Sequence, residues 1–185
     1  MNLQQELKDR GALLDGHFRL SSGRHSDRFI QKFRILEDPT IVEQVAREIA
    51  EHFRDARPTI VVSAAVGGII LGYEVARALG TKAIFVEKEN GVPVLRRNFQ
   101  LEPSDRALVV EDVVTTGGSV KEVLEVVRGT GAHIAGVGVI VQRGEADFGV
   151  PTYALLTMPI ESHDPEQCPQ CEKGEPLTDP GSRRK

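Results

Sequence analysis

This chain of 185 residues has few cysteines, no long apolar run and no excess of basic residues. Two cysteines are too few for a disulfide scaffold. No apolar run reaches the roughly 18 residues that a membrane-spanning helix needs, and the N-terminus MNLQQELKDRG lacks the apolar centre of an export signal. A net charge of -4 gives no support for nonspecific nucleic-acid binding, which favours a basic face. We therefore expect a soluble cytoplasmic protein.

Two common phosphate-binding signatures and internal repeats are also missing. The chain contains no GxxxxGK[ST] P-loop, and no GxGxxG follows a strand near its start. The remaining composition, 40% hydrophobic and 27% charged, is ordinary for a globular protein. The length suits one domain that buries a real core, with small appendages.

Apolar β-branched runs alternate with helical patterns from residue 59 onward. Helices are expected within 70–79 and 119–129. Strands are expected at 59–62, 82–88, 106–113, 134–143 and 152–158. Alternation of this kind predicts an α/β fold, in which right-handed crossovers build a parallel sheet that helices cover on both faces.

The flanking segments differ in texture. Residues 3–14 predict a short amphipathic helix, and 16–31 contain short strand candidates. Asp38 caps a further helix with Pro39 at its first position. Its apolar stripe consists of Ile41, Val42, Val45, Ile49 and Phe53. Residues 164–185 are rich in proline and charge, which predicts an irregular extension.

The stretch VVEDVVTTGGS at 109–119 joins a strand end to a helix start. Ligands of open α/β sheets collect at the carboxyl ends of strands. Backbone N–H groups, hydroxyls and a helix N-terminus around Thr115–Ser119 favour an anion. A strand–helix turn with an ordinary Thr/Ser cap uses the same residues and is the plain alternative.

The preceding pair Glu111–Asp112 favours a ligand with two ends. Adjacent carboxylates repel an anion unless something lies between them. A ribose 5-phosphate resolves the conflict, because its hydroxyls donate to the acids while its phosphate sits on the loop. An intervening Mg²⁺ is the other solution.

Two apolar residues, two acids and a Thr/Gly run before a helix resemble the site at which phosphoribosyltransferases bind 5-phosphoribosyl 1-diphosphate (PRPP). Three further segments resemble orotate phosphoribosyltransferases in order and spacing. They are GALLDGHFRLSSGRHSDRFIQ (11–31), SAAVGG (63–68) and VIVQRGE (139–145). The resemblance spans roughly residues 7–160. It implies a type I phosphoribosyltransferase fold over residues 1–163, with a small N-terminal hood largely from 1–35 and a C-terminal tail at 164–185.

The implied reaction converts PRPP and orotate to orotidine 5′-monophosphate and pyrophosphate, the penultimate step of pyrimidine nucleotide synthesis. The resemblance assigns Glu111 and Asp112 to the ribose hydroxyls and to the oxocarbenium-like centre. It assigns the 5′-phosphate to a loop whose residues are Val113, Val114, Thr115, Thr116, Gly117, Gly118 and Ser119. It implies Mg²⁺ as cofactor, held mainly by PRPP and not by direct protein ligation.

The same resemblance gives roles to residues outside this motif. Ala65, Val66 and Gly67 are implied in a pyrophosphate loop, where the family often has a non-proline cis peptide. Arg143 is implied to bind the orotate carboxylate, for which a guanidinium fork is suited; Thr115 also touches the base. Phe29 is the implied aromatic neighbour of orotate, with an ordinary core position as the alternative.

Several basic positions depart from the family pattern. Ser21 stands where some relatives place a PRPP-contacting lysine. Lys32, Arg24 and His25 are alternative sources of charge, and each is by default a solvated side chain. These departures leave open which charge takes that lysine's role.

The largest departure is the loop over 86–105. Lys88 matches one basic position and is the expected pyrophosphate contact, but Glu87 stands where an arginine is usual. The turn ENGVP predicts a short hairpin, and Arg96 and Arg97 are either substitutes or structural residues. Family loops reach into the partner's site, so a homodimer is expected.

The motif CPQC at 168–171 is compatible with zinc, which needs four ligands. Only His163 lies nearby in the sequence as a third ligand, and one CxxC without a second pair is a weak signal. We therefore interpret Cys168 and Cys171 as reduced thiols in a turn.

Three functions remain open at this stage. The first is orotate phosphoribosyltransferase. The second is a purine or uracil phosphoribosyltransferase of the same fold. Arg143 and the N-terminal segment favour orotate over such a neutral base. The third is a non-catalytic PRPP-sensing regulator, for which an added DNA-binding segment or a basic face is missing from the sequence.

Overall fold

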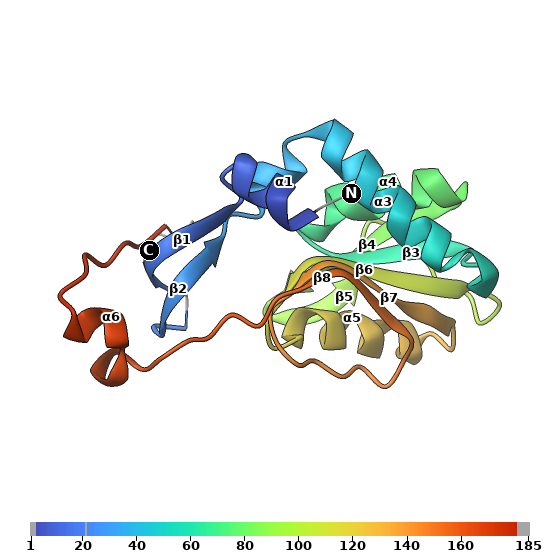
Figure 1. Cartoon of the computed structure of the whole chain (residues 1–185). Coiled ribbons are helices and arrows are strands. Elements are labelled where there is room, and N and C mark those ends of the chain that lie inside the picture. The colour runs from blue at the N-terminus through green and yellow to red at the C-terminus, as the bar shows by residue number, and fades with distance from the viewer. Residues whose placement is uncertain (1–2, 21, 181–185) are drawn as a thin grey trace. The chain divides into compact units, whose positions relative to one another are not determined.

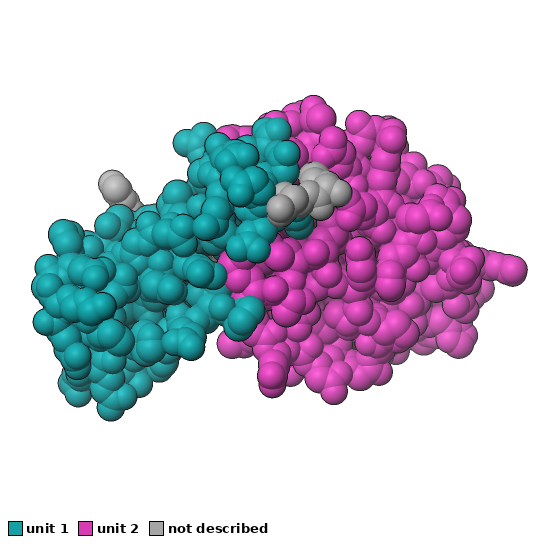
Figure 2. All heavy atoms as spheres, in the orientation of Figure 1, with its two compact units in different colours: residues 1–35, 159–185 teal, residues 36–158 magenta. Residues whose placement is uncertain are grey.

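The computed structural model describes residues 3–20 and 22–180 (Figure 1). The chain forms two compact units, residues 36–158 and residues 1–35 together with 159–185 (Figure 2). The C-terminal segment therefore shares a unit with the N-terminal hairpin. The sequence had led us to expect it as a separate tail after residue 163.

A six-stranded sheet in the order β5-β4-β3-β6-β7-β8 is the centre of the larger unit. Its strands are β3 (Ile60–Ala64), β4 (Lys82–Glu89), β5 (Val92–Leu95), β6 (Arg106–Val114), β7 (His133–Gln142) and β8 (Thr152–Thr157). All neighbours pair in parallel except β5, which is antiparallel to β4. The predicted parallel sheet is confirmed.

Three helices cover this sheet. Figure 1 shows α3 (Pro39–His52) and α4 (Gly68–Leu79) on one face and α5 (Gly118–Gly129) on the other. The predicted cap of α3 is confirmed, because the Asp38 carboxylate accepts from Thr40 N at 2.9 Å. No helix within the described residues is both long enough and apolar enough to cross a membrane.

The central position of β6 between β3 and β7 decides where the chemistry can lie. Its residues Leu108, Val109 and Val110 are almost completely buried. Helix α5 packs on one face of the sheet through Val123, Leu124 and Val127. Because the carboxyl ends of β3, β4, β6 and β7 share one edge, the segments that follow these strands converge there.

The N-terminal part of the smaller unit holds α1 (Leu3–Asp9), β1 (Leu13–Arg19) and β2 (His25–Ile30), followed by α2 (Phe33–Leu36). The helix predicted over residues 3–14 is wrong beyond Asp9. Gly11 adopts a left-handed backbone with φ of 64°, and Ala12 N donates to Leu7 O at 2.7 Å. This closing bond ends the helix, and Leu14 belongs to β1.

The C-terminal segment pairs with both edges of the β1–β2 hairpin. His163 and His25 exchange two backbone hydrogen bonds of 2.8 and 2.9 Å. Thr178 N donates to His17 O at 2.8 Å, and Arg19 N donates to Thr178 O at 2.9 Å. Between these pairings lie the short η2 (Pro165–Gln167) and α6 (Pro169–Glu172). Backbone pairing at His163 and Thr178 therefore holds the extension that composition predicted to be irregular.

Gly138 of β7 provides a test of how α3 packs on the sheet. A Cβ on Gly138 would lie 2.5 Å from Ile49 Cγ2, and Ile49 is completely buried. We expect Gly138→Ala to lower the free energy of unfolding by about 1–3 kcal/mol, because a full core accepts an added carbon only by displacement. Denaturant unfolding measures the change.

Gly129→Ala is the matched control, since a Cβ there meets nothing within 4 Å. It should leave the free energy of unfolding unchanged or slightly higher. Equal unfolding midpoints for Gly138→Ala and the wild type would contradict the packing described for α3 and β7.

Candidate functional site

Two buried acids lie at the carboxyl end of β6. Glu111 is 7% exposed and Asp112 is 1% exposed. Each accepts a local backbone hydrogen bond: Asp112 N donates to Glu111 Oε1 at 3.0 Å, and Val113 N donates to Asp112 Oδ1 at 2.6 Å. Strand alternation places the two side chains on opposite faces of β6. The carboxylates are thus held in fixed directions directly before the loop.

The loop from Thr115 to Ser119 joins β6 to α5. Gly117 adopts φ of 79°, a left-handed conformation that favours glycine. A Cβ at Gly117 would lie 2.7 Å from the Phe148 ring, so the glycine is needed for space as well. Thr115, Thr116 and Ser119 are exposed. The loop therefore presents hydroxyls and the N-terminus of α5 to solvent, as an anion site requires.

A pocket of about 270 Å³ lies over this loop. It brings together the predicted phosphate loop, one of the two acids and the predicted pyrophosphate lysine. Its lining residues are Lys88, Glu111, Val113, Val114, Thr115, Thr116, Gly117, Gly118, Ser119, Val120 and Glu122. Asp112 and Arg143 are not among them.

The loop after β3 has the small residues that the sequence singled out. The Ala65–Val66 peptide is cis, as the resemblance implied for this position. Val66 is 74% exposed, and Ala65 N donates to Val86 O at 2.9 Å. A Cβ on Gly68 would lie 3.6 Å from Glu111 Oε1. This loop and the acids of β6 are therefore neighbours at one sheet edge.

Arg143 follows β7 next to the start of the phosphate loop. Its backbone N donates to Val114 O at 2.8 Å, which extends the β6–β7 ladder by one bond. Its side chain is half-buried. The arginine predicted to select the base thus stands one strand away from the predicted phosphate loop.

The basic loop of the family is replaced here by a tight hairpin, as the ENGVP turn predicted. Asn90 and Gly91 have φ of 52° and 83°, and β4 and β5 pair directly on either side of them. Arg97 holds Glu87 with two hydrogen bonds of 2.9 and 3.0 Å. This bidentate pair lowers the pKa of Glu87 and raises that of Arg97. Of the two roles considered for Arg97, the structure shows the structural one.

Lys88 has a partner that the sequence did not reveal. Its Nζ lies 2.8 Å from Glu122 Oε1 on α5, and both side chains are substantially exposed. Glu122 is 34 positions away in the sequence, so no local pattern joins the two. An exposed pair of this kind is weak, which leaves the lysine available to a more highly charged anion.

The hairpin residues with predicted roles lie in the smaller unit. Phe29 of β2 is half-buried, with its ring centroid 5.8 Å from that of Phe18. Ser21, which stands where relatives carry a lysine, is outside the described residues. Arg24 donates to the Asp164 carboxylate at 2.6 Å and to the Ser162 hydroxyl at 3.0 Å. This arginine therefore anchors the C-terminal segment.

The default interpretation of His25 as a solvated side chain is wrong. The residue is only 6% exposed, and its Nδ1 faces His17 Nε2 at 3.2 Å. Phe148 is a second residue whose role sequence reasoning missed, because nothing local showed that its ring would pack beneath Gly117. Both roles arise from contacts between segments that are distant in the chain.

The site at the edge of the larger unit can hold a ligand with two chemically different ends. Buried carboxylates accept hydrogen bonds from hydroxyl groups, whereas the helix N-terminus and loop favour a phosphate. Lys88 adds a mobile positive charge at the same pocket. This combination suits a phosphorylated sugar.

Comparison with known proteins identifies the family. A family model described as a phosphoribosyl transferase domain matches residues 33–155. The orotate phosphoribosyltransferase of Pelotomaculum thermopropionicum is 53% identical over 176 residues, which cover 94% of this chain and 93% of that protein.

Solved structures with this fold include transferases that use different bases. The orotate phosphoribosyltransferase from Aeropyrum pernix matches with a TM-score of 0.71 at 30% identity, over 84% of this chain and 93% of that one. The adenine phosphoribosyltransferase from Thermoanaerobacter pseudethanolicus matches with a TM-score of 0.62 at 16% identity, over 71% of this chain and 88% of that one. The fold alone therefore does not show which base is used. The sequence identity to the two orotate phosphoribosyltransferases does show the family. This chain belongs to the orotate phosphoribosyltransferase family.

Proposed function

We propose that this protein transfers the ribose 5-phosphate of PRPP to orotate, forming orotidine 5′-monophosphate and releasing pyrophosphate for pyrimidine nucleotide synthesis. The observation that carries the proposal is the buried pair Glu111–Asp112 directly before a glycine and hydroxyl loop at a helix N-terminus. Membership of the orotate phosphoribosyltransferase family supports orotate as the base.

The ribose 5-phosphate is divided between the two parts of the motif. Its 2′- and 3′-hydroxyls donate to Glu111 and Asp112, and its 5′-phosphate accepts from the backbone N–H groups and hydroxyls of residues 113–119. Burial of the acids strengthens these charge-assisted bonds, because little water competes for them.

The diphosphate of PRPP is assigned to the small loop Ala65–Gly67 and to Lys88, which exchanges Glu122 for the diphosphate. Mg²⁺ fits the pocket over the loop, because the carboxylates of Glu111 and Glu122 and the hydroxyls of the loop line it and Mg²⁺ prefers oxygen ligands. Such an ion would be held mainly by the diphosphate of PRPP and would supply neutralising charge to the leaving group.

Chemistry at the sugar carbon requires no covalent intermediate with the protein. As pyrophosphate departs, positive charge develops on the ribose ring, and the fixed negative charges of Glu111 and Asp112 stabilise it. The phosphate loop and Arg143 hold the sugar and the base in line for displacement.

The base site uses Arg143, whose guanidinium can bind the orotate carboxylate through two parallel hydrogen bonds. Thr115 is proposed to contact the base as well as the phosphate. Phe29 is proposed as its aromatic contact, as the family resemblance implies. A neutral base lacks the carboxylate that Arg143 requires.

We also propose that the protein acts as a homodimer. Helix α4 begins at the pyrophosphate loop and carries two exposed apolar side chains one turn apart, Ile70 at 45% and Tyr73 at 65% exposure. A second copy of the chain that covers this stripe would remove both side chains from water and lie beside the loop.

The assay that tests the function combines the protein with Mg²⁺, PRPP and orotate and follows the loss of orotate absorbance. We expect turnover with orotate and none with adenine, hypoxanthine or uracil. Retained PRPP binding without orotate turnover would contradict the proposal. Turnover of a purine or of uracil would instead assign a different base.

The role of Asp112 predicts the effect of a nearly isosteric change. Asp112→Asn should lower kcat by about 100-fold or more, because the developing charge on the sugar loses a fixed carboxylate. Circular dichroism and denaturant unfolding should show an intact fold. Wild-type turnover in this variant would refute the assigned role.

The role of Arg143 predicts a change confined to the base. Arg143→Ala should reduce kcat/KM for orotate by roughly 10- to 100-fold, since a charge-assisted bond contributes about 1.5–3 kcal/mol. The KM for PRPP should stay close to that of the wild type. Arg128→Ala is the control, because Arg128 lies on α5 and pairs with Glu125 at 2.6 Å. Equal effects of the two substitutions on orotate would contradict the assignment.

A further inference from the structure

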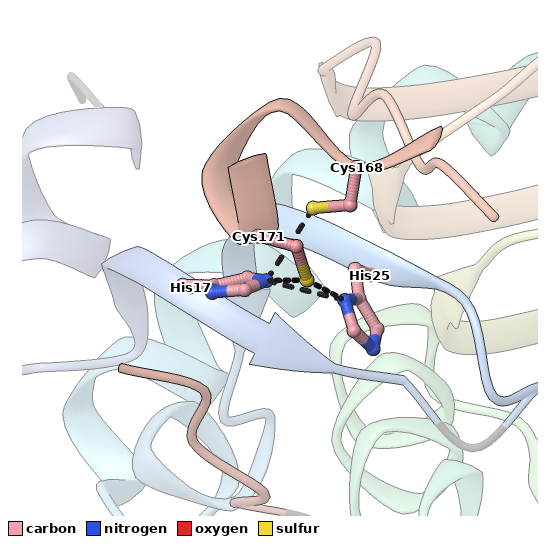
Figure 3. Close-up of side chains that lie close together, drawn as sticks. All are labelled: His17, His25, Cys168 and Cys171. Carbon is pink, nitrogen blue, oxygen red and sulfur yellow. Dashed lines mark hydrogen bonds between the residues drawn. The ribbon is translucent and has the colours of Figure 1, made fainter. Parts of the chain in front are cut away.

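Four metal-ligating side chains meet in the smaller unit (Figure 3). His17 comes from β1, His25 from β2, and Cys168 and Cys171 from the CPQC segment at α6. One potential ligand atom of each residue lies within 4.8 Å of those of the others. His17, His25 and Cys168 are buried, and Cys171 closes the group from outside. These residues have no part in the proposed transfer reaction.

The separations match those between the ligands of a tetrahedral zinc ion. With Zn–N of about 2.0–2.1 Å and Zn–S of about 2.3 Å, two nitrogens lie about 3.4 Å apart, and a nitrogen and a sulfur about 3.6 Å apart. His17 Nε2 lies 3.2 Å from His25 Nδ1. The four atoms also include nitrogen–sulfur distances of 3.2, 3.4 and 3.7 Å.

Hydrogen bonding alone does not account for this arrangement. His17 Nδ1 lies 2.9 Å from the Glu175 carbonyl oxygen, which only accepts, so Nδ1 carries the proton of the neutral ring. Nε2 then offers one lone pair, yet a nitrogen and two sulfurs surround it. A backbone carbonyl that holds the distal ring N–H is also the usual support of a metal-ligating histidine.

We propose that His17, His25, Cys168 and Cys171 bind one Zn²⁺ ion in a closed structural site. Two thiolates and two neutral imidazoles complete the four-coordinate shell, so no position remains for water or substrate. The third and fourth ligands come from the hairpin and not from His163, the one histidine near the cysteines in the sequence. The His163 ring lies 3.9 Å from the Glu161 carboxylate and is not a member of the group.

The zinc ion stabilises a C-terminal segment that has almost no hydrophobic core. Among residues 159–180, only Cys168 is buried, so this segment has almost no apolar core of its own. A two-stranded hairpin is also marginal by itself in water. One zinc ion bonded to both strands and to the CPQC turn joins three segments that are far apart in the sequence. Metal binding of this kind contributes directly to folding.

A bulge in β1 helps to form the site. The pairing of β1 with β2 shifts register between Asp15 and Phe18, and His17 lies within this irregular stretch. Gln170 Nε2 donates to Gly16 O at 3.0 Å, which fixes the CPQC turn against the bulge. Contacts outside the four proposed ligand side chains therefore hold the hairpin and the CPQC turn next to each other.

Metal analysis of the full-length reduced protein tests the proposal. Inductively coupled plasma mass spectrometry should find about one zinc per chain, either as isolated or after Zn²⁺ is added and excess removed. Replacement by Co²⁺ should produce the visible bands of a tetrahedral ion and thiolate-to-cobalt charge-transfer bands. A reduced, folded protein that carries no zinc and takes up neither metal would overturn the proposal, as would iron in these positions.

Matched variants locate the site. His17→Gln and Cys168→Ser should each lower zinc content to well below half an ion per chain, whereas His163→Gln should keep the wild-type content. Because either ligand variant can fail to fold, chelation of the wild type gives a second measurement. Removal of zinc should make residues 159–180 susceptible to protease and both thiols reactive, and added zinc should restore protection. Zinc loss confined to His163→Gln, or protection independent of zinc, contradicts the assignment.

Discussion

The proposed site depends on two buried carboxylates that stand directly before a loop that attracts an anion. The arrangement would be unfavourable for a simple phosphate, because Glu111 and Asp112 would repel it. It becomes favourable for a ligand whose hydroxyls and phosphate are separated by a sugar ring. The position of β6 between β3 and β7 fixes the directions of both acids, and Gly117 lets the loop close over Phe148. The same sheet edge places the loop Ala65–Gly67, Lys88 and Arg143.

The two units of the chain are stabilised by different means. The larger unit has helices on both faces of a sheet and buries most of its central strand β6. In the smaller unit, residues 159–180 contribute one buried side chain, and they are held to the β1–β2 hairpin by backbone pairing and by side-chain hydrogen bonds such as those of Arg24. A segment with so little apolar burial gains order from a metal much more than the larger unit would.

Periodicity and turn chemistry predicted the elements of the larger unit because those signals are local. Neighbouring residues alone predict the Asp38–Pro39 helix start, the Asn90–Gly91 turn and the strand that carries Glu111. The helix over 3–14 was overextended because Leu14 fits a helical stripe, while Gly11 ended the helix through a closing bond. The Lys88–Glu122 pair and the meeting of His17 with Cys168 and Cys171 were not predictable, since they join residues 34 to 154 positions apart. Besides the CPQC motif, the sequence contains the other two proposed ligands only as the separate histidines His17 and His25, which form no recognisable metal-binding pattern.

The central claim is that the acids bind the sugar and the loop binds the phosphate, and binding of orotidine 5′-monophosphate and its 2′-deoxy analogue tests it most directly. Calorimetry would give both affinities for the wild type, Glu111→Gln and Asp112→Asn. We expect the wild type to favour the 2′-hydroxyl form by about 1.5–3 kcal/mol, the contribution of a hydrogen bond to a charged group. We also expect this preference to shrink in at least one of the two variants. A preference that persists unchanged in both, with each ligand weakened equally, would contradict the division of the site.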